Sequence, residues 1–169
     1  MSDPRSNLSL SNPWHLLATG FGSGLSPIVP GTMGTLASVP FYLMLAQLPL
    51  ILYAVVVVFA SLIGIKICQV TSDDMQVHDH GSIVWDEFAG FWITMLIVPL
   101  YQLPVFDWKW LVTGFVLFRF FDMLKPWPIS WLDKRVHGGF GIMIDDLVAG
   151  VMAAISLAAI GYWLEWLPV

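Results

Sequence analysis

Acidic side chains gather in two short polar segments of this chain, where they could bind a metal cation. Nine of the twelve Asp and Glu residues lie within residues 73–87 or 122–146. The segments that follow, 88–106 and 147–164, contain no Asp, Glu, Lys, Arg or His. Charge is therefore concentrated beside long apolar segments, which is typical of a carboxylate site at a membrane face.

The first acidic segment ends in Asp86 and Glu87, directly ahead of the apolar run that starts at Phe88. Asp79 lies seven residues before Asp86, which is about two helical turns if the helix starts early. Three carboxylates could then meet at one helix end. Acidic residues in a first turn also stabilise the helix dipole. That alternative explains one acid better than an adjacent pair with a third acid and two histidines nearby.

Asp145 and Asp146 repeat this arrangement ahead of the apolar run that starts at Leu147. Two carboxylate pairs on one membrane face repel each other unless a cation neutralises them. Oxygen ligands favour Mg²⁺, with Mn²⁺ or Ca²⁺ as substitutes, and the nearby histidines leave Mn²⁺ or Zn²⁺ open. The sequence thus predicts a divalent-metal site whose ligands are Asp86, Glu87, Asp145 and Asp146.

Arg119, Asp122 and Lys125 follow one another at intervals of three residues before Pro126. This spacing keeps them on roughly one helix face, and the proline ends the helix. A basic pair beside an acidic metal site is what a phosphate ester requires. An internal salt bridge with a topology-setting lysine is the alternative.

The segment 20–34 is rich in Gly, Pro and hydroxyl side chains and leads into a predicted helix. Its backbone N–H groups could bind an anion, with Ser26, Gly31 and Thr32 as candidate contacts. It lacks the Gly-Lys-Ser/Thr ending of a Walker A loop. Ordinary turns are the alternative explanation.

Composition predicts an all-α integral membrane protein. The chain is 57% apolar and 11% charged, with a mean hydropathy of +0.77, whereas soluble domains are roughly 45–50% apolar and about 25% charged. Its 169 residues allow about four to five spans in one domain, with 1–33 as a cytoplasmic segment and 34–169 as a helical bundle. The expected spans are 34–48, which is short or re-entrant, 52–70, 88–106, 108–124 and 147–166.

The distribution of basic residues predicts the topology. With five spans and the N-terminus inside, six of the seven Lys and Arg lie at the cytoplasmic face. Both acidic segments and segment 20–34 then share that face. The net charge of −5 argues against nucleic-acid binding, and the single cysteine, Cys68, excludes an internal disulfide or a thiolate cluster. The oligomeric state is left open.

Long ordered motifs indicate a family. They begin at Asn12 (NPWHLLA), Gly22 (GSGLSP), Pro30 (PGTMG), Val77 (VHDHGSIVWDE), Asp122 (DMLKPWPI) and His137 (HGG, continuing to Asp146). From about Asn12 to Ile160 the chain resembles the phosphatidylglycerophosphatase A family of Gram-negative bacteria. The resemblance implies a magnesium-dependent phosphatase of the bacterial inner membrane that converts phosphatidylglycerophosphate to phosphatidylglycerol and orthophosphate, with its active site facing the cytoplasm.

A mechanistic hypothesis gives each candidate residue a role. Asp79 and Asp122 would join the metal-binding carboxylates as catalytic groups. Arg119 and Lys125 would stabilise charge on the phosphate, together with the backbone of segment 20–34. His80 or His137 would protonate the leaving oxygen. Attack by water and attack by an aspartate, through an aspartyl-phosphate, are both open.

Two other functional classes are alternatives to a lipid phosphatase. A cation transporter or channel predicts acidic residues near the middle of spans, whereas the sequence places them at span ends. A binding module or assembly factor would release no phosphate from any lipid. The signatures of other phosphatases are absent from the chain, including Cys-x5-Arg, Asp-x-Asp-x-Thr and Lys-x6-Arg-Pro.

Overall fold

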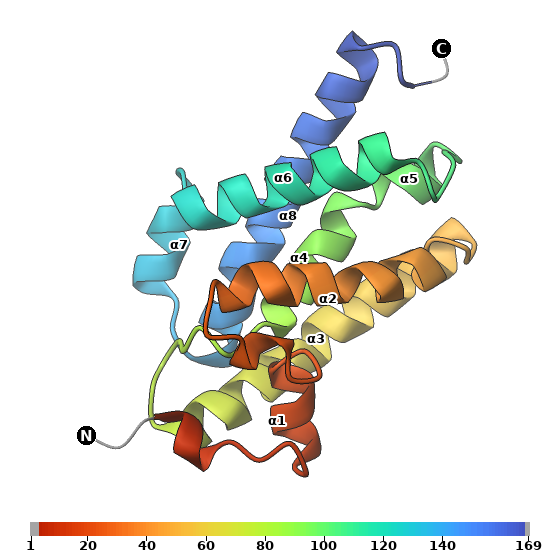
Figure 1. The fold of residues 1–169 in the computed structure, drawn as a ribbon. Helices are drawn as coiled ribbons and strands as arrows, with labels where there is room; N and C mark the ends of the chain where they lie inside the picture. Colours follow the sequence, from red (N-terminus) through yellow and green to blue (C-terminus); the bar gives the residue numbers. More distant parts are fainter. Residues whose placement is uncertain (1–3, 168–169) are drawn as a thin grey trace.

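The computed structural model describes residues 4–167, which form helices joined by short connections, with no strand among them (Figure 1). The predicted all-α class is confirmed. In chain order the elements are the 3₁₀ helix η1 (Pro4–Asn7), α1 (Pro13–Ala18), the 3₁₀ helix η2 (Ser23–Leu25), α2 (Pro30–Leu45), α3 (Leu50–Met75), α4 (Trp85–Thr94), α5 (Ile97–Leu100), α6 (Trp108–Leu124), α7 (Ile129–Arg135) and α8 (Gly138–Trp163).

Helices α4 and α8 form the centre of the bundle. α8 packs against α3, α4, α6 and α7, and α4 packs against α2, α3 and α6 as well. In Figure 1, α4 (green) lies between α2 (orange) and α6 (teal). Nine of the ten residues of α4 are buried. A helix buried on all sides belongs to the core. Asp86 and Glu87 therefore lie in the first turn of a core helix.

Two glycines allow α4 and α8 to approach closely. A Cβ atom added to Gly150 would meet the backbone of Gly90, and one added to Gly90 would meet the carbonyl oxygen of Asp146 at 2.6 Å. The hydroxyl of Thr94 donates to the carbonyls of Gly90 at 3.1 Å and Gly150 at 3.3 Å. Small residues at a helix crossing permit this backbone contact. The crossing fixes the spacing of the two helices.

We expect Gly150→Ala to destabilise the protein by about 1–3 kcal/mol, because the added methyl group forces the two backbones apart. Thermal unfolding in detergent would measure the loss. Ala159→Val, on the exposed face of the same helix, is the matched control and should leave the melting temperature within about 2 °C. A Gly150→Ala variant as stable as the natural protein would contradict the tight crossing.

Among the described residues, two helices are long and apolar enough to cross a membrane, α3 and α8. They contain the predicted span 52–70 and most of 147–166. α6 coincides with the predicted segment 108–124. The segment 34–48 lies mostly in α2, which starts earlier, at Pro30, and continues through Pro40. The number of spans, predicted as four to five, stays a prediction.

The uninterrupted span predicted at 88–106 is wrong. The helix ends at Thr94, and the short helix α5 follows from Ile97 to Leu100. Pro99 explains the break, because it has no N–H to donate to the carbonyl of Met95 and its ring crowds that carbonyl. The Met95 carbonyl instead accepts from Val98 N–H at 3.0 Å. The segment is therefore a helix with a break rather than a straight span.

Large apolar side chains cover the outside of the bundle. They include Leu36 and Met44 on α2, Ile51, Val55 and Phe59 on α3, Val112, Val116 and Phe120 on α6, and Val151 and Ile155 on α8, each at least 47% exposed. Soluble monomers rarely expose apolar surface over so many neighbouring elements. These faces suit contact with lipid chains.

Candidate active site

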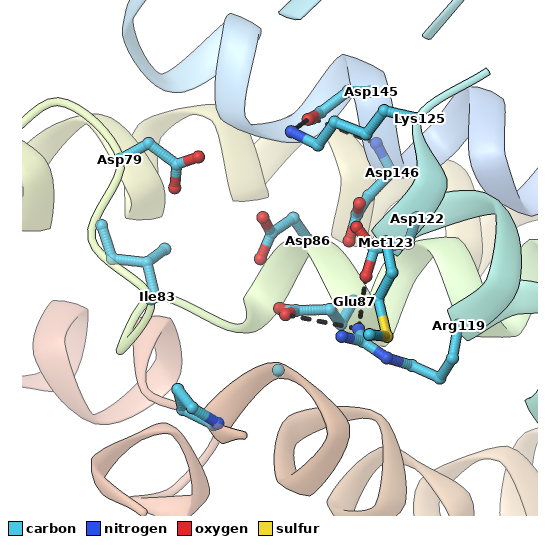
Figure 2. A pocket seen from close by; sticks show the side chains of 13 residues that line it. Asp79, Ile83, Asp86, Glu87, Arg119, Asp122, Met123, Lys125, Asp145 and Asp146 are labelled. Carbon is cyan, nitrogen blue, oxygen red and sulfur yellow. Dashed lines mark hydrogen bonds and ion pairs between the residues drawn. The ribbon is translucent and has the colours of Figure 1, made fainter. Parts of the chain in front are cut away.

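The acidic and basic residues of the motifs converge on one pocket of about 330 Å³ (Figure 2). It lies where the start of α4, the third turn of α8, the end of α6 and the start of α2 meet, beneath the connection between α3 and α4. Its lining consists of Pro30, Gly31, Asp79, Gly81, Ile83, Asp86, Glu87, Arg119, Asp122, Met123, Lys125, Asp145 and Asp146. Nine of the sequence-predicted site residues are thus brought together.

Three buried carboxylates form the inner part of the pocket. Each of Asp86, Glu87 and Asp146 has an oxygen within 4.8 Å of an oxygen of the other two. All three residues are less than 10% exposed. One oxygen of each, Oδ1 of Asp86, Oε2 of Glu87 and Oδ2 of Asp146, is buried without a hydrogen-bond partner. Buried carboxylate oxygens without donors are costly unless a proton or a cation compensates them.

The glycine crossing places these carboxylates. Asp86 lies four residues before Gly90, and Asp146 lies four residues before Gly150. Residues four apart share one helix face, so each acid lies about one turn from the point where α4 and α8 touch. Because the helices are closest there, the two acids must face each other across a short distance.

The start of α8 differs from the sequence interpretation. Asp145 and Asp146 were expected to open a helix at Leu147, but α8 already begins at Gly138. The glycine-rich start is helical because Gly139 packs directly on α3, where an added Cβ would meet Gln69 N at 2.7 Å. The two acids therefore lie two turns inside a helix. Capping or dipole stabilisation cannot explain them there.

Asp145 is separated from the carboxylate cluster by a lysine. Lys125 Nζ donates to Asp145 Oδ2 at 2.6 Å and to Asp133 Oδ1 at 2.5 Å. Burial lowers the pKa of Lys125, but the hydrogen bonds to Asp133 and Asp145 outweigh burial and hold that pKa above its ordinary value. Lys125 is thus a fixed positive charge. Its backbone is left-handed, with φ of 42°, which costs energy for a non-glycine residue and aims the side chain back at α8.

Arg119 is held on the opposite side of the cluster. Its Nη1 lies 2.5 Å from Asp122 Oδ2 and 3.7 Å from Glu87 Oε1, and it donates to Thr35 Oγ1 at 3.4 Å. Its Nε is buried without a partner. The salt bridge between Arg119 and Asp122, which the sequence offered as an alternative to a substrate role, is therefore present. Arg119 lines the pocket, so its guanidinium places a positive charge beside the carboxylates.

The start of α2 contributes an apolar edge and backbone donors. Pro30 and Gly31 line the pocket, and a Cβ on Gly31 would collide with Glu87 Oε1 and lie 3.0 Å from Arg119 Nη2. Only glycine leaves that space free. The first N–H groups of a helix have no partner within the helix, so the first turn of α2 is suited to bind an anion beside Arg119.

Four predicted site residues are not among the residues that line this pocket. His80 accepts from Ser82 N–H through Nδ1 at 3.1 Å, and His137 precedes α8 with its ring packed on His78, 5.4 Å between centroids. The Ser26 hydroxyl donates to the carbonyl of Ile28 at 2.9 Å. Thr32 follows Gly31 in the first turn of α2. His80 and His137, the two residues expected to protonate the leaving oxygen, therefore do not line the pocket.

The sequence interpretation missed two polar residues that hold the basic side chains. Thr35, fully buried, accepts from Arg119, and its position four residues after Gly31 would have placed it on the same face of α2. Asp133 binds Lys125 across the turn between α6 and α7. No periodic signal links those two, because the turn contains Pro126 and Pro128.

The donor set fits a hard divalent cation. Six carboxylates and two basic side chains line the pocket, which leaves a formal excess of four negative charges. A phosphate ester, itself an anion, would be repelled by this lining alone. Asp86, Glu87 and Asp146 offer oxygen ligands within reach of one ion, as Mg²⁺ prefers. Asp145 is already paired with Lys125 and is the least suited of the four predicted ligands.

Comparisons with known proteins identify the family of this chain. Residues 16–161 match the family model described as phosphatidylglycerophosphatase A. The chain is 60% identical to phosphatidylglycerophosphatase A of Escherichia coli (strain K12) over 94% of this chain and 89% of that protein, and 46% identical to the protein of the same name from Haemophilus influenzae over 96% and 98%. A relative in Bacteroides thetaiotaomicron, provisionally named a phosphatidylinositol-3-phosphatase, is 37% identical over 88% and 92%. No solved structure matches. The chain belongs to the phosphatidylglycerophosphatase A family.

Proposed function

We propose that this enzyme removes the terminal phosphate from phosphatidylglycerophosphate, giving phosphatidylglycerol and orthophosphate, with Mg²⁺ as cofactor. The observation that carries the proposal is the pocket in which three buried, incompletely paired carboxylates face Arg119 and Lys125. The family and the relatives named phosphatidylglycerophosphatase A support the substrate. The Bacteroides relative is named for a different lipid phosphate, which is again a phosphate ester on a lipid.

The basic residues would bind the phosphate oxygens. Arg119 lines the pocket and is held by Asp122 and Thr35, so its guanidinium can bind a phosphate oxygen with little further loss of side-chain entropy. Lys125 supplies a second positive charge that Asp133 and Asp145 hold in place. Donors fixed before the substrate arrives stabilise charge on the transferring phosphoryl group most effectively.

The carboxylates would divide into two roles. Asp86, Glu87 and Asp146 would hold Mg²⁺, which when bound supplies charge neutralisation and lowers the pKa of a coordinated water. Asp79 is the exposed carboxylate of the pocket lining and can accept a proton from water at the mouth. Attack by water and formation of an aspartyl-phosphate both remain compatible with this arrangement.

We place the enzyme in the bacterial inner membrane with the pocket at the cytoplasmic face. α3 and α8 are apolar and long enough to span, and α2 and α6 also expose apolar faces. Six of the seven Lys and Arg lie on the pocket side under the predicted topology, as the positive-inside rule requires. Sided labelling of cysteines placed at the exposed residues Ile28 and Asp73 in sealed vesicles would test this orientation.

A cation transporter or channel is the competing proposal, and one observation favours it. Asp145 and Asp146 lie inside α8 rather than at its start, so the argument from helix ends is lost. The basic lining still argues against transport, because Arg119 and Lys125 would repel a permeating cation. Phosphate release decides between the two functions.

The decisive experiment is phosphate release from phosphatidylglycerophosphate by the detergent-purified enzyme, with Mg²⁺ and with excess chelator. We expect release with Mg²⁺ and a drop of at least about 10³-fold with chelator. Glu165→Gln, an exposed residue outside the pocket, is the matched control and should behave as the natural protein. Release that persists in chelator would refute the metal, and no release under any metal would refute the enzyme function.

A further inference from the structure

Met123 stands out in the pocket lining because it is large, apolar and mostly exposed. Its relative exposure is 68%, although the other side chains of the lining are chiefly charged. In Figure 2 the Met123 side chain lies beside the pair formed by Glu87 and Arg119, at the edge of the pocket. An exposed apolar side chain at the mouth of a charged site has no role in binding phosphate itself.

Met123 connects the pocket to an apolar surface outside it. On α6, Phe120 and Val116 follow at helical intervals and are more than half exposed. On α2, Met33 and Leu36 lie one and two turns beyond Pro30, also exposed. The pocket therefore opens onto an apolar surface on its α2 and α6 side, whereas Asp79 and Lys125 make other parts of its lining polar.

Helices α2 and α6 do not close this side by packing on each other. Both pack on α4, which separates most of α2 from α6. A hydrogen bond from Arg119 on α6 to Thr35 on α2 links the two helices. The pocket itself is lined from both helices, by Pro30 and Gly31 of α2 and by Met123 of α6. A ligand with its phosphate beside Arg119 can therefore extend its other end outward between these two helices.

We propose that the diacylglycerol end of the lipid substrate leaves the pocket between α2 and α6, and that Met123 contacts its acyl chain and favours lipid over soluble phosphate esters. This inference rests on the proposed phosphatase function. An amphipathic ligand fits the asymmetry of the mouth, with its phosphate among the fixed donors and its apolar part on Met123 and Phe120. Apolar contact of this kind is recovered only by substrates that carry acyl chains.

The test compares Met123→Gln, Met123→Leu and Met44→Gln on long-chain phosphatidylglycerophosphate and on a short-chain, water-soluble analogue. Met44 is 59% exposed on the far part of α2 and is not among the pocket-lining residues, so it is the matched control for a new amide on an exposed helix face. We expect Met123→Gln to lower kcat/KM for the long-chain lipid about fivefold to tenfold, with little change for the short-chain analogue. Met123→Leu and Met44→Gln should preserve the ratio between substrates.

The results distinguish failure of the proposed role of Met123 from failure of the proposed phosphatase function. Equal losses on both substrates, or an equal effect of Met44→Gln, would overturn the role of Met123 while leaving the phosphatase function intact. If the natural protein releases phosphate from neither substrate, the proposed function fails and this inference fails with it. A circular dichroism spectrum and melting temperature like those of the natural protein ensure that a loss is not misfolding.

Discussion

Asp86→Asn is expected to lower turnover by at least about 10³-fold while making the metal-free protein more stable. The substitution keeps the size of the side chain but removes one of three buried carboxylates whose oxygens lie within 4.8 Å of each other. Loss of a ligand removes several kcal/mol of charge stabilisation from the reaction. In chelator, however, the same change removes like-charge repulsion in a buried cluster.

Asp86→Asn should thus lower turnover but raise stability in chelator, a combination that general damage to the fold would not produce. We expect the melting temperature in chelator to rise by about 2–4 °C for Asp86→Asn, corresponding to roughly 1 kcal/mol in a chain of this size. Added Mg²⁺ should raise the melting temperature of the natural protein, because it binds only the folded state. Mg²⁺ should not stabilise the variant in the same way.

Metal binding can be measured without turnover. Mn²⁺ serves as a spectroscopic substitute, detected by electron paramagnetic resonance and displaced by Mg²⁺. Asp73→Asn, an exposed carboxylate on α3 outside the pocket, is the matched control. A variant Asp86→Asn that keeps both Mn²⁺ affinity and turnover would refute the ligand assignment. Adding Asp146→Asn should cost little further activity, since residues that bind one ion act as a unit.

Membership of the site was predictable from the sequence because charge is confined to a few short segments. In a chain with so few ionisable residues, acids beside apolar runs must meet at the membrane face or stay buried at high cost. Asp86 and Glu87 were correctly expected at a helix start, since the apolar run begins directly after them. The polar positions therefore carried more information than the apolar ones.

The details of helix boundaries depended on packing that a single sequence does not display. The start of α8 at Gly138 requires α3 to accept Gly139 closely, a tertiary contact. The break after Thr94 had a local cause in Pro99, yet Pro40 lies within α2 without ending it. A proline alone therefore does not determine whether a helix ends.

The different roles of Asp145 and Asp146 also could not be predicted from the sequence. Adjacent acids in a sequence look equivalent, but successive helix residues point about 100° apart. Asp146 therefore joins the cluster with Asp86, while Asp145 turns toward Lys125. The position of Lys125 depends on its left-handed backbone at the end of α6. Only the three-dimensional arrangement shows which acid is free to bind metal.

Arg119→Lys is expected to lower kcat/KM by about 10²-fold, even though the charge is kept. A lysine ammonium cannot hold both Asp122 and Thr35 as the guanidinium does and still keep further N–H donors for a phosphate. The rigid guanidinium matches phosphate with two parallel hydrogen bonds, which an ammonium group does not reproduce. Arg135→Lys, outside the pocket with its guanidinium over the Trp131 ring, is the matched control and should be near normal.

Inhibition by inorganic phosphate separates a substrate role for Arg119 from a purely structural salt bridge. If Arg119 binds the phosphate, Arg119→Lys should weaken phosphate inhibition about as much as it lowers kcat/KM. Asp122→Asn should weaken it much less, because the guanidinium keeps its charge, its contact with Thr35 and its position 3.7 Å from Glu87. If both variants weaken inhibition equally, the ion pair is what matters and Arg119 acts by holding α6 in place. Normal phosphate inhibition in Arg119→Lys would remove this residue from the binding site and leave Lys125 and the start of α2 to bind the phosphate.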